Sequence, residues 1–99
     1  MSRTFPGVPG GELLAQGLAD IARGVPSLAA CLVAMAGPRL ETLGLLAAGA
    51  VDAVRTGEAF ELAAYRLLAV DHGVAAHGRF NALARELDSG LRVLARDVR

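Results

Sequence analysis

Apolar side chains recur at intervals of three and four residues along most of the chain, the spacing of one face of an α-helix. This pattern predicts helices over residues 12–23, 28–36, 39–55, 58–71 and 73–97. The longest regular stripe runs through the last two segments, at Phe60, Ala63, Ala64, Leu67, Val70, Val74, Phe80, Leu83, Ala84, Leu87, Leu91, Leu94 and Val98. We therefore expect an all-α fold, a compact bundle of four to five helices with a long C-terminal helix.

Glycine, proline and small polar residues separate the predicted helices. Gly24 is placed to end the first helix, and Ser27 is placed to cap the second, which is apolar on all sides. Thr56 is placed to cap the fourth helix. Gly44 and Gly49 fall inside the third, where each glycine costs about 1 kcal/mol relative to alanine. We expect these two glycines to admit a close helical neighbour.

The beginning of the chain lacks the helical pattern. Prolines and glycines are frequent between residues 5 and 11, which is typical of an irregular segment. The sequence therefore predicts an extended N-terminal arm over residues 1–11, followed by a single helical-bundle domain over residues 12–99.

The composition favours association with a partner. Hydrophobic residues make up 54% of the 99 residues and aromatic residues only 4%. A bundle of this length is near the lower limit of what one core stabilises, and monomers seldom expose large apolar patches. We therefore expect a homo-oligomer or a subunit of a larger protein complex.

Charge and hydropathy restrict the possible functions. Ten acidic residues balance ten arginines, and there is no lysine, so neither Schiff-base chemistry nor a P-loop is available. Zero net charge argues against a general attraction to nucleic acid or to anionic lipid. The apolar runs at 28–36 and 43–51 are shorter than the roughly 20 residues of a membrane span. We expect a cytoplasmic protein without a membrane span.

Both histidines and the single tyrosine lie within residues 65–80. His72 and His77 are about 140° apart around one helix, so they could share a metal ion only if Gly73 breaks the helix. Asp71 falls on the apolar side by helical phase, where a bare carboxylate is costly, and we expect it to cap a helix that begins at His72 or Gly73.

Cys31 is the only cysteine and lies in an apolar run, where a buried thiol is expected. A single cysteine cannot form an intrachain disulfide or a multi-cysteine zinc site. The sequence therefore predicts no metal site and no cofactor.

Arg66 and His72 form an R-x5-H pattern. It resembles the R-x(4–6)-H signature of HEPN-domain ribonucleases, small all-α proteins whose paired motifs cut RNA across a dimer. The resemblance implies that Arg66 and His72 would bind and activate at the scissile phosphate. It covers two residues, and Leu67 stands where that family commonly has a polar residue.

Two further polar groups share a helix face. Glu61, Tyr65 and His72 form a row in which a carboxylate, a phenol and an imidazole could move protons, or which is a solvated polar face. A stripe of arginines on the last helix could contact phosphates or a partner, at Arg85, Arg92, Arg96 and Arg99. Asp88 is placed to pair with Arg92 four residues on, which favours a solvated, salt-bridged face.

These patterns predict a non-enzymatic interaction protein, either a homo-oligomer or an accessory subunit of a larger complex. The alternatives are a HEPN-like ribonuclease that uses Arg66 and His72, and an RNA-binding accessory protein that uses the arginine stripe.

Overall fold

The computed structural model describes residues 4–97, and the side chains of residues 4–96. Every regular element in this range is a helix, which confirms the all-α prediction. The elements are the α-helices and two short 3₁₀ helices (η), in the order α1 (Gly11–Arg23), α2 (Leu28–Ala34), α3 (Gly37–Thr42), η1 (Ala50–Val54), α4 (Phe60–His72), η2 (Gly73–Ala75) and α5 (Ala76–Asp97).

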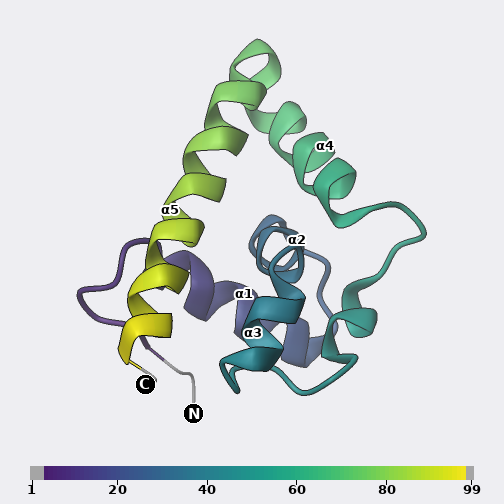
Figure 1. Ribbon diagram of the computed structural model, residues 1–99. Coiled ribbons are helices and arrows are strands. Elements are labelled where there is room, and N and C mark those ends of the chain that lie inside the picture. Colours follow the sequence, from purple (N-terminus) through teal and green to yellow (C-terminus); the bar gives the residue numbers. More distant parts are fainter. Residues whose placement is uncertain (1–3, 98–99) are drawn as a thin grey trace.

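The two longest sides of the molecule are α4 and α5, which diverge from a sharp turn (Figure 1). α2 lies between their far ends, and α1 and α3 lie at the base. The radius of gyration is 12.9 Å, close to the roughly 13 Å of a compact domain of this length. The principal extents of 40 × 25 × 22 Å show one long dimension. The turn between α4 and α5 therefore projects beyond the packed body.

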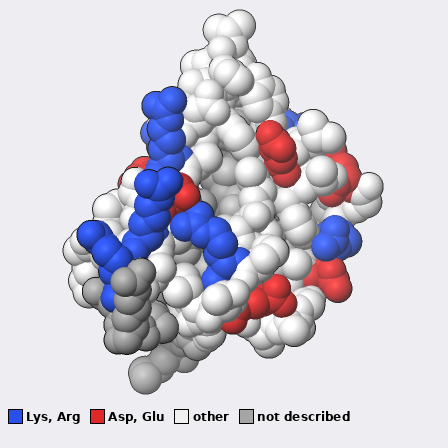
Figure 2. All heavy atoms as spheres, viewed as in Figure 1, with Lys and Arg blue, Asp and Glu red and all other residues white. Residues whose placement is uncertain are grey.

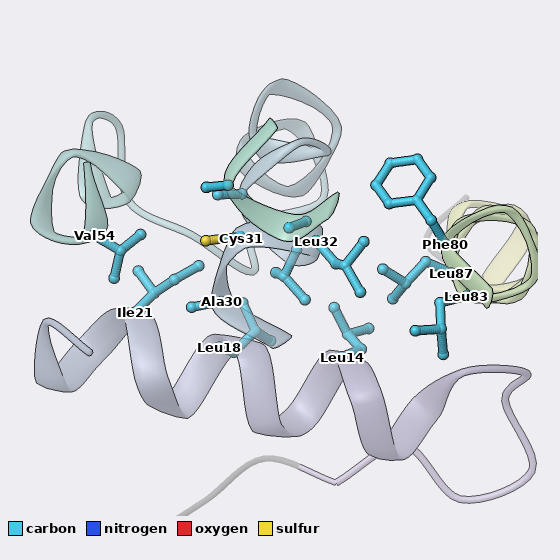
Figure 3. Close-up of a cluster of buried hydrophobic side chains, with 14 of the residues drawn as sticks. Leu14, Leu18, Ile21, Ala30, Cys31, Leu32, Val54, Phe80, Leu83 and Leu87 are labelled. Atoms are coloured by element: carbon cyan, nitrogen blue, oxygen red, sulfur yellow. The ribbon is translucent and has the colours of Figure 1, made fainter. Parts of the chain in front are cut away.

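The core forms around α2, which packs against α1, α4 and α5. As predicted, this helix is buried on all sides, from Ala29 to Ala34. Figure 3 shows the side chains that converge on it, namely Leu14, Leu18 and Ile21 from α1, Val54 from η1, and Phe80, Leu83 and Leu87 from α5. The regular period of α1 and α5 thus turns one face of each helix to a common core.

Two glycines permit close backbone approach. Gly17 of α1 faces Val33 and the carbonyl oxygen of Ala29 in α2, and a β-carbon at residue 17 would overlap both. Gly90 of α5 faces the carbonyl oxygen of Pro9 in the same way. The first fixes the crossing of α1 and α2, and the second seats the N-terminal segment on α5.

A buried carboxylate fixes the connection between α1 and α2. Asp20 is 4% exposed and accepts hydrogen bonds from Gln16 Nε2 at 3.0 Å and Ser27 Oγ at 2.6 Å, and it also pairs with Arg23. Ser27 Oγ in turn accepts from the backbone N–H of Ala30 at 3.1 Å, which confirms Ser27 as the cap of α2. The hydrogen bond from Ser27 lowers the pKa of Asp20, outweighing the opposite effect of burial.

The N-terminal segment is not extended over its described part. Residues 6–10 form turns and a bend, in which Val8 N donates to Phe5 O at 3.2 Å and Gly11 N donates to Val8 O at 2.9 Å. Phe5 packs against the core. Residues 1–3 of the predicted arm lie outside the described residues.

The predicted helix over residues 39–55 is wrong. α3 ends at Thr42, and the chain turns at Gly44 (φ +74°) and Gly49 (φ +78°) before it forms η1. Both glycines occupy the left-handed region that other residues rarely adopt. They serve turns and do not admit a neighbouring helix, because a β-carbon at residue 44 would meet nothing within 4 Å.

The start of α4 also differs from the prediction. The helix begins at Phe60 with Ala59 as its N-cap residue and no capping side chain, so Thr56 is not the cap. The predicted cap at Asp71 is wrong as well. Asp71 is exposed within the last turn of α4, where water solvates its carboxylate.

The expected break between the last two helices lies at Gly73. This residue has φ +54° and ψ −121°, a combination that side chains disfavour strongly. The stripe prediction is wrong for Val70 and Val74, which are 79% and 105% exposed. They lie near the projecting turn, where no other helix covers them (Figure 1).

Within residues 4–97, no single helix combines the length and the apolarity that crossing a membrane requires. α1 and α2 reach them only when taken together, with a bend of 96° between them.

Candidate functional site

Arg66 and His72 lie on the same helix, and α4 does not bring them together. Six residues correspond to about 9 Å along a helix and about 120° around it. Arg66 donates to one oxygen of Glu58 from Nε at 3.0 Å and from Nη2 at 2.6 Å. His72 is exposed in the last turn. Arg66 thus ties α4 to the segment before it, and its guanidinium is turned to a carboxylate instead of to His72.

Tyr65 has His77 of α5 as its ring neighbour, with 6.2 Å between ring centroids. Phe80 lies on the same ring at 6.1 Å, and His77 Nε2 is 3.3 Å from Asn81 Nδ2. Glu61 and His72, the other members of the predicted row, are exposed on α4. The described neighbours of His77 are the Tyr65 ring and the Asn81 amide, and no described carboxylate pairs with it. The arrangement suits packing of α4 on α5 better than proton transfer.

The arginines of α5 are exposed, and one carboxylate organises part of them. Asp88 Oδ2 is 3.0 Å from Arg92 Nε, which confirms the predicted pair. Asp88 Oδ1 accepts a hydrogen bond of 2.8 Å from Arg39 Nη1 of α3. The hydrogen bond from Arg39 is the main reason that the pKa of Asp88 lies below its usual value. Arg99 of the predicted stripe lies outside the described residues.

A hollow of about 560 Å³ joins three guanidinium groups to a hydroxyl. Arg39, Arg92, Arg96 and Ser89 line it together with Pro9, Val93 and Ala95. Figure 2 shows arginine side chains gathered over α5 and beside α3, with acidic side chains next to some of them and others toward the side of α4. Arg85 lines a separate hollow with Asn81. We call the first of these the arginine hollow.

Sequence reasoning missed Arg39 as a member of this group. It stands 49 residues before Asp88, and the sequence placed it in a helix that does not form as predicted. Spacing on one helix can indicate a stripe such as Arg92 and Arg96. No local pattern indicates which residue of another helix will join it.

Exposed apolar side chains gather on α4 and the projecting turn. Leu62 is 62% exposed and Tyr65 is 40% exposed, and Ala69 lies on the same side of the helix, within about 60° of both. Val70 and Val74 are also exposed, nearer the turn, and the exposed Arg66 lies between Leu62 and Val70 on the surface of α4. We call the five residues Leu62, Tyr65, Ala69, Val70 and Val74 the hairpin surface.

Among the described residues, no group of three or more His, Cys, Asp or Glu side chains could hold a metal ion. Cys31 is buried in α2, and burial raises the pKa of its thiol. A thiol that keeps its proton is a poor nucleophile and a poor metal ligand. Cys31 therefore contributes packing.

Comparison with protein-family models, with curated proteins and with solved structures gives no match.

Proposed function

We propose that this protein is a non-enzymatic interaction protein that pairs with a second copy of itself through the hairpin surface. The observation that carries the proposal is the concentration of exposed apolar side chains on α4 and its turn, with Leu62, Val70 and Val74 each more than 60% exposed.

The exposed area supports a partner at this surface. The accessible surface is 5908 Å², whereas a compact monomer of 10.2 kDa has about 5,300 Å². Burial of a large aliphatic side chain contributes about 1.5–3 kcal/mol, so Leu62, Val70 and Val74 from both copies of a two-fold pair supply roughly 9–18 kcal/mol. Association costs about 4–15 kcal/mol, so burial of these side chains offsets most or all of that cost, and the flanking polar residues add to it.

The distribution of charge favours a second copy as the partner. Glu61 and Asp71 are exposed on α4, and Arg79 and Arg85 are exposed on α5. No described ion pair uses any of these four side chains. These acidic side chains and arginines are therefore available for ion pairs between two copies. Zero net charge also removes long-range repulsion between copies.

Sedimentation equilibrium of the wild type and of Val70→Arg tests the proposal. Residue 70 is exposed, so the substitution should leave the fold, followed by circular dichroism, unchanged. We expect the wild type to approach twice the chain mass and Val70→Arg to sediment as a monomer. Val25→Arg is the matched control, since Val25 is an exposed apolar residue between α1 and α2 and should leave the mass unchanged.

A wild type that stays monomeric at about 100 µM, well above the dissociation constants of most stable dimers, would contradict self-association. If that monomer is instead recovered in a larger complex that Val70→Arg abolishes and Val25→Arg retains, the same surface serves an accessory subunit.

A further inference from the structure

We infer that the arginine hollow binds a phosphoryl dianion, held by Arg39, Arg92 and Arg96 with the hydroxyl of Ser89. This inference goes beyond the proposed function, because the hollow lies between α3 and the C-terminal half of α5, away from the turn that carries the hairpin surface (Figure 1).

Two of the guanidinium groups are held in place before any ligand arrives. Asp88 contacts Arg39 through one oxygen and Arg92 through the other, at 2.8 and 3.0 Å. Each contact uses one guanidinium nitrogen, and a guanidinium has five N–H donors. The remaining donors are free to bind an anion. Because Asp88 restrains both side chains, less rotamer entropy is lost on binding.

The charge of the hollow matches the ligand. Among the described side chains, three arginines with one carboxylate beside them leave a net charge of +2. A phosphate monoester carries about −1.5 to −2 at pH 7, and its three terminal oxygens accept hydrogen bonds. Arg96 has no described carboxylate partner, and it lies one helical turn from Arg92. Asp88 pairs with Arg39 and Arg92 but not with Arg96, so the positive charge of Arg96 favours an additional anion beside Arg92.

The lining favours a compact phosphate group over a nucleic-acid strand. The side chains that line the hollow include no aromatic ring on which a base could stack. The lining consists instead of guanidinium groups, one hydroxyl and small apolar side chains at Val93 and Ala95. Guanidinium groups match the geometry of phosphate oxygens, and the apolar residues can contact the body of a small ester.

A titration of the full chain, followed by amide chemical shifts, tests the inference. The probes are inorganic phosphate and glycerol 2-phosphate, with sodium chloride at equal ionic strength as the reference. We expect saturable shifts centred on Ser89 with a dissociation constant in the millimolar range, as befits an exposed site. Equal binding of both probes identifies the free anion as sufficient, and tighter binding of the ester indicates that Val93 and Ala95 contact its body.

Three variants separate a built site from general attraction. Arg96→Gln should weaken binding about tenfold, since it removes one charge-assisted contact. Ser89→Asp, which places a carboxylate in the hollow, should abolish binding, and Ser89→Ala should weaken it without a change of charge. Arg55→Gln is the matched control, because Arg55 is an exposed arginine paired with Asp52 and is remote from the hollow in the chain.

Three results would overturn the inference. One is the absence of saturable shifts with either probe at any concentration up to the solubility limit. Another is an equal loss of affinity in Arg55→Gln and Arg96→Gln, which would reveal non-specific attraction. The third is tighter binding of a single-stranded RNA oligomer than of glycerol 2-phosphate, with a steep salt dependence that Arg96→Gln reduces.

Discussion

Asp20 shows how one side chain can hold a turn together. It sits where α1 ends and α2 begins, and its oxygens satisfy donors from both sides of the connection. The sequence signals that identified Ser27 as a cap did not reveal that Asp20 binds the same hydroxyl. Capping can be predicted because it spans three residues, whereas this contact spans seven and needs the turn to form first.

We predict that Asp20→Asn destabilises the protein by about 1.5–3 kcal/mol, the usual contribution of hydrogen bonds to a charged group. In this variant the side-chain nitrogen is a donor and cannot accept the hydrogen bonds that a carboxylate oxygen of Asp20 accepts in the wild type. Urea denaturation measures the change. Asp52→Asn is the control, because it breaks an exposed pair with Arg55 and should cost less than about 1 kcal/mol. Equal effects in the two variants would contradict the role of Asp20.

The same residue predicts a pH dependence. The pKa of Asp20 is lower in the folded chain than in the unfolded chain, where it is about 3.9. Its contribution to stability is therefore complete above the unfolded pKa and is lost as the pH falls through the folded pKa. Unfolding free energies measured between about pH 6 and pH 3 should fall less steeply in Asp20→Asn. Parallel curves for the two proteins would contradict this assignment.

Two glycines of α5 provide a second residue-scale prediction. Gly90→Ala should destabilise by about 1–3 kcal/mol, because the added methyl overlaps the Pro9 carbonyl and must displace the N-terminal segment. Gly78→Ala adds the same methyl where nothing lies within 4 Å, so it should be neutral or stabilising by up to about 1 kcal/mol. Thermal unfolding of both variants measures the difference, and a destabilising Gly78→Ala would contradict it.

The R-x5-H pattern fixes which two residue types are present and how far apart they are in sequence. It does not show whether the two side chains meet in the folded protein. Arg66 is bound by Glu58, and His72 lies about 120° around α4 from it, so a ribonuclease would need these residues to meet across two copies. The ribonuclease alternative stays a prediction. RNA cleavage by the purified protein that is unchanged in His72→Ala would exclude it.

At the scale of helices, the spacing of apolar residues predicts which face of a helix is apolar. It does not predict which other element covers that face. α1, α2 and α5 follow the predicted pattern closely because each lies against the core along most of its length. The predicted stripe continues to Val70 near the end of α4 and Val74 in η2, but both side chains are exposed. Coverage depends on tertiary arrangement, and the sequence pattern carries no information about it.

Glycine illustrates the same limit. The sequence pattern predicted close helical approach at Gly44 and Gly49, and this prediction is wrong. Those residues have positive φ angles and make turns, while Gly17 and Gly90 carry the close contacts. A glycine that serves backbone conformation and one that serves packing look alike in sequence. Because Gly44 and Gly49 adopt turn conformations, the helix predicted over residues 39–55 ends at Thr42.

We predict that Gly73→Ala destabilises the protein by about 1–3 kcal/mol, since its φ and ψ fall in a region that alanine avoids. A relaxed turn would also move α4 relative to α5. Denaturation gives the free energy, and the amide signals of Tyr65 and His77 report the movement. An unchanged denaturation midpoint together with unchanged amide signals would contradict the requirement for glycine at residue 73.

The molecule as a whole has zero net charge, and the exposed Glu61 and Asp71 of α4 and Arg79 and Arg85 of α5 are available for ion pairs between copies. If copies pair as proposed, raising sodium chloride from about 50 to 500 mM shortens the Debye length to a few ångströms and screens these contacts. We predict a weakening of the pair by less than about tenfold, because exposed ion pairs contribute little and the apolar contact remains. Sedimentation at both concentrations measures it. Complete dissociation in high salt would contradict an apolar interface.

The contact between Pro9 and Gly90 joins the first and last parts of the chain, so it cannot form until α5 has been synthesised. At about 5–20 residues per second, residue 91 is added on the order of 3–14 seconds after the last residue of α1. During this interval Leu14 lacks the side chains of Leu83 and Leu87 of α5, which lie beside it in the folded chain (Figure 3). The apolar face of α1 therefore stays incompletely covered until the last helix has been made, and the fold closes only then.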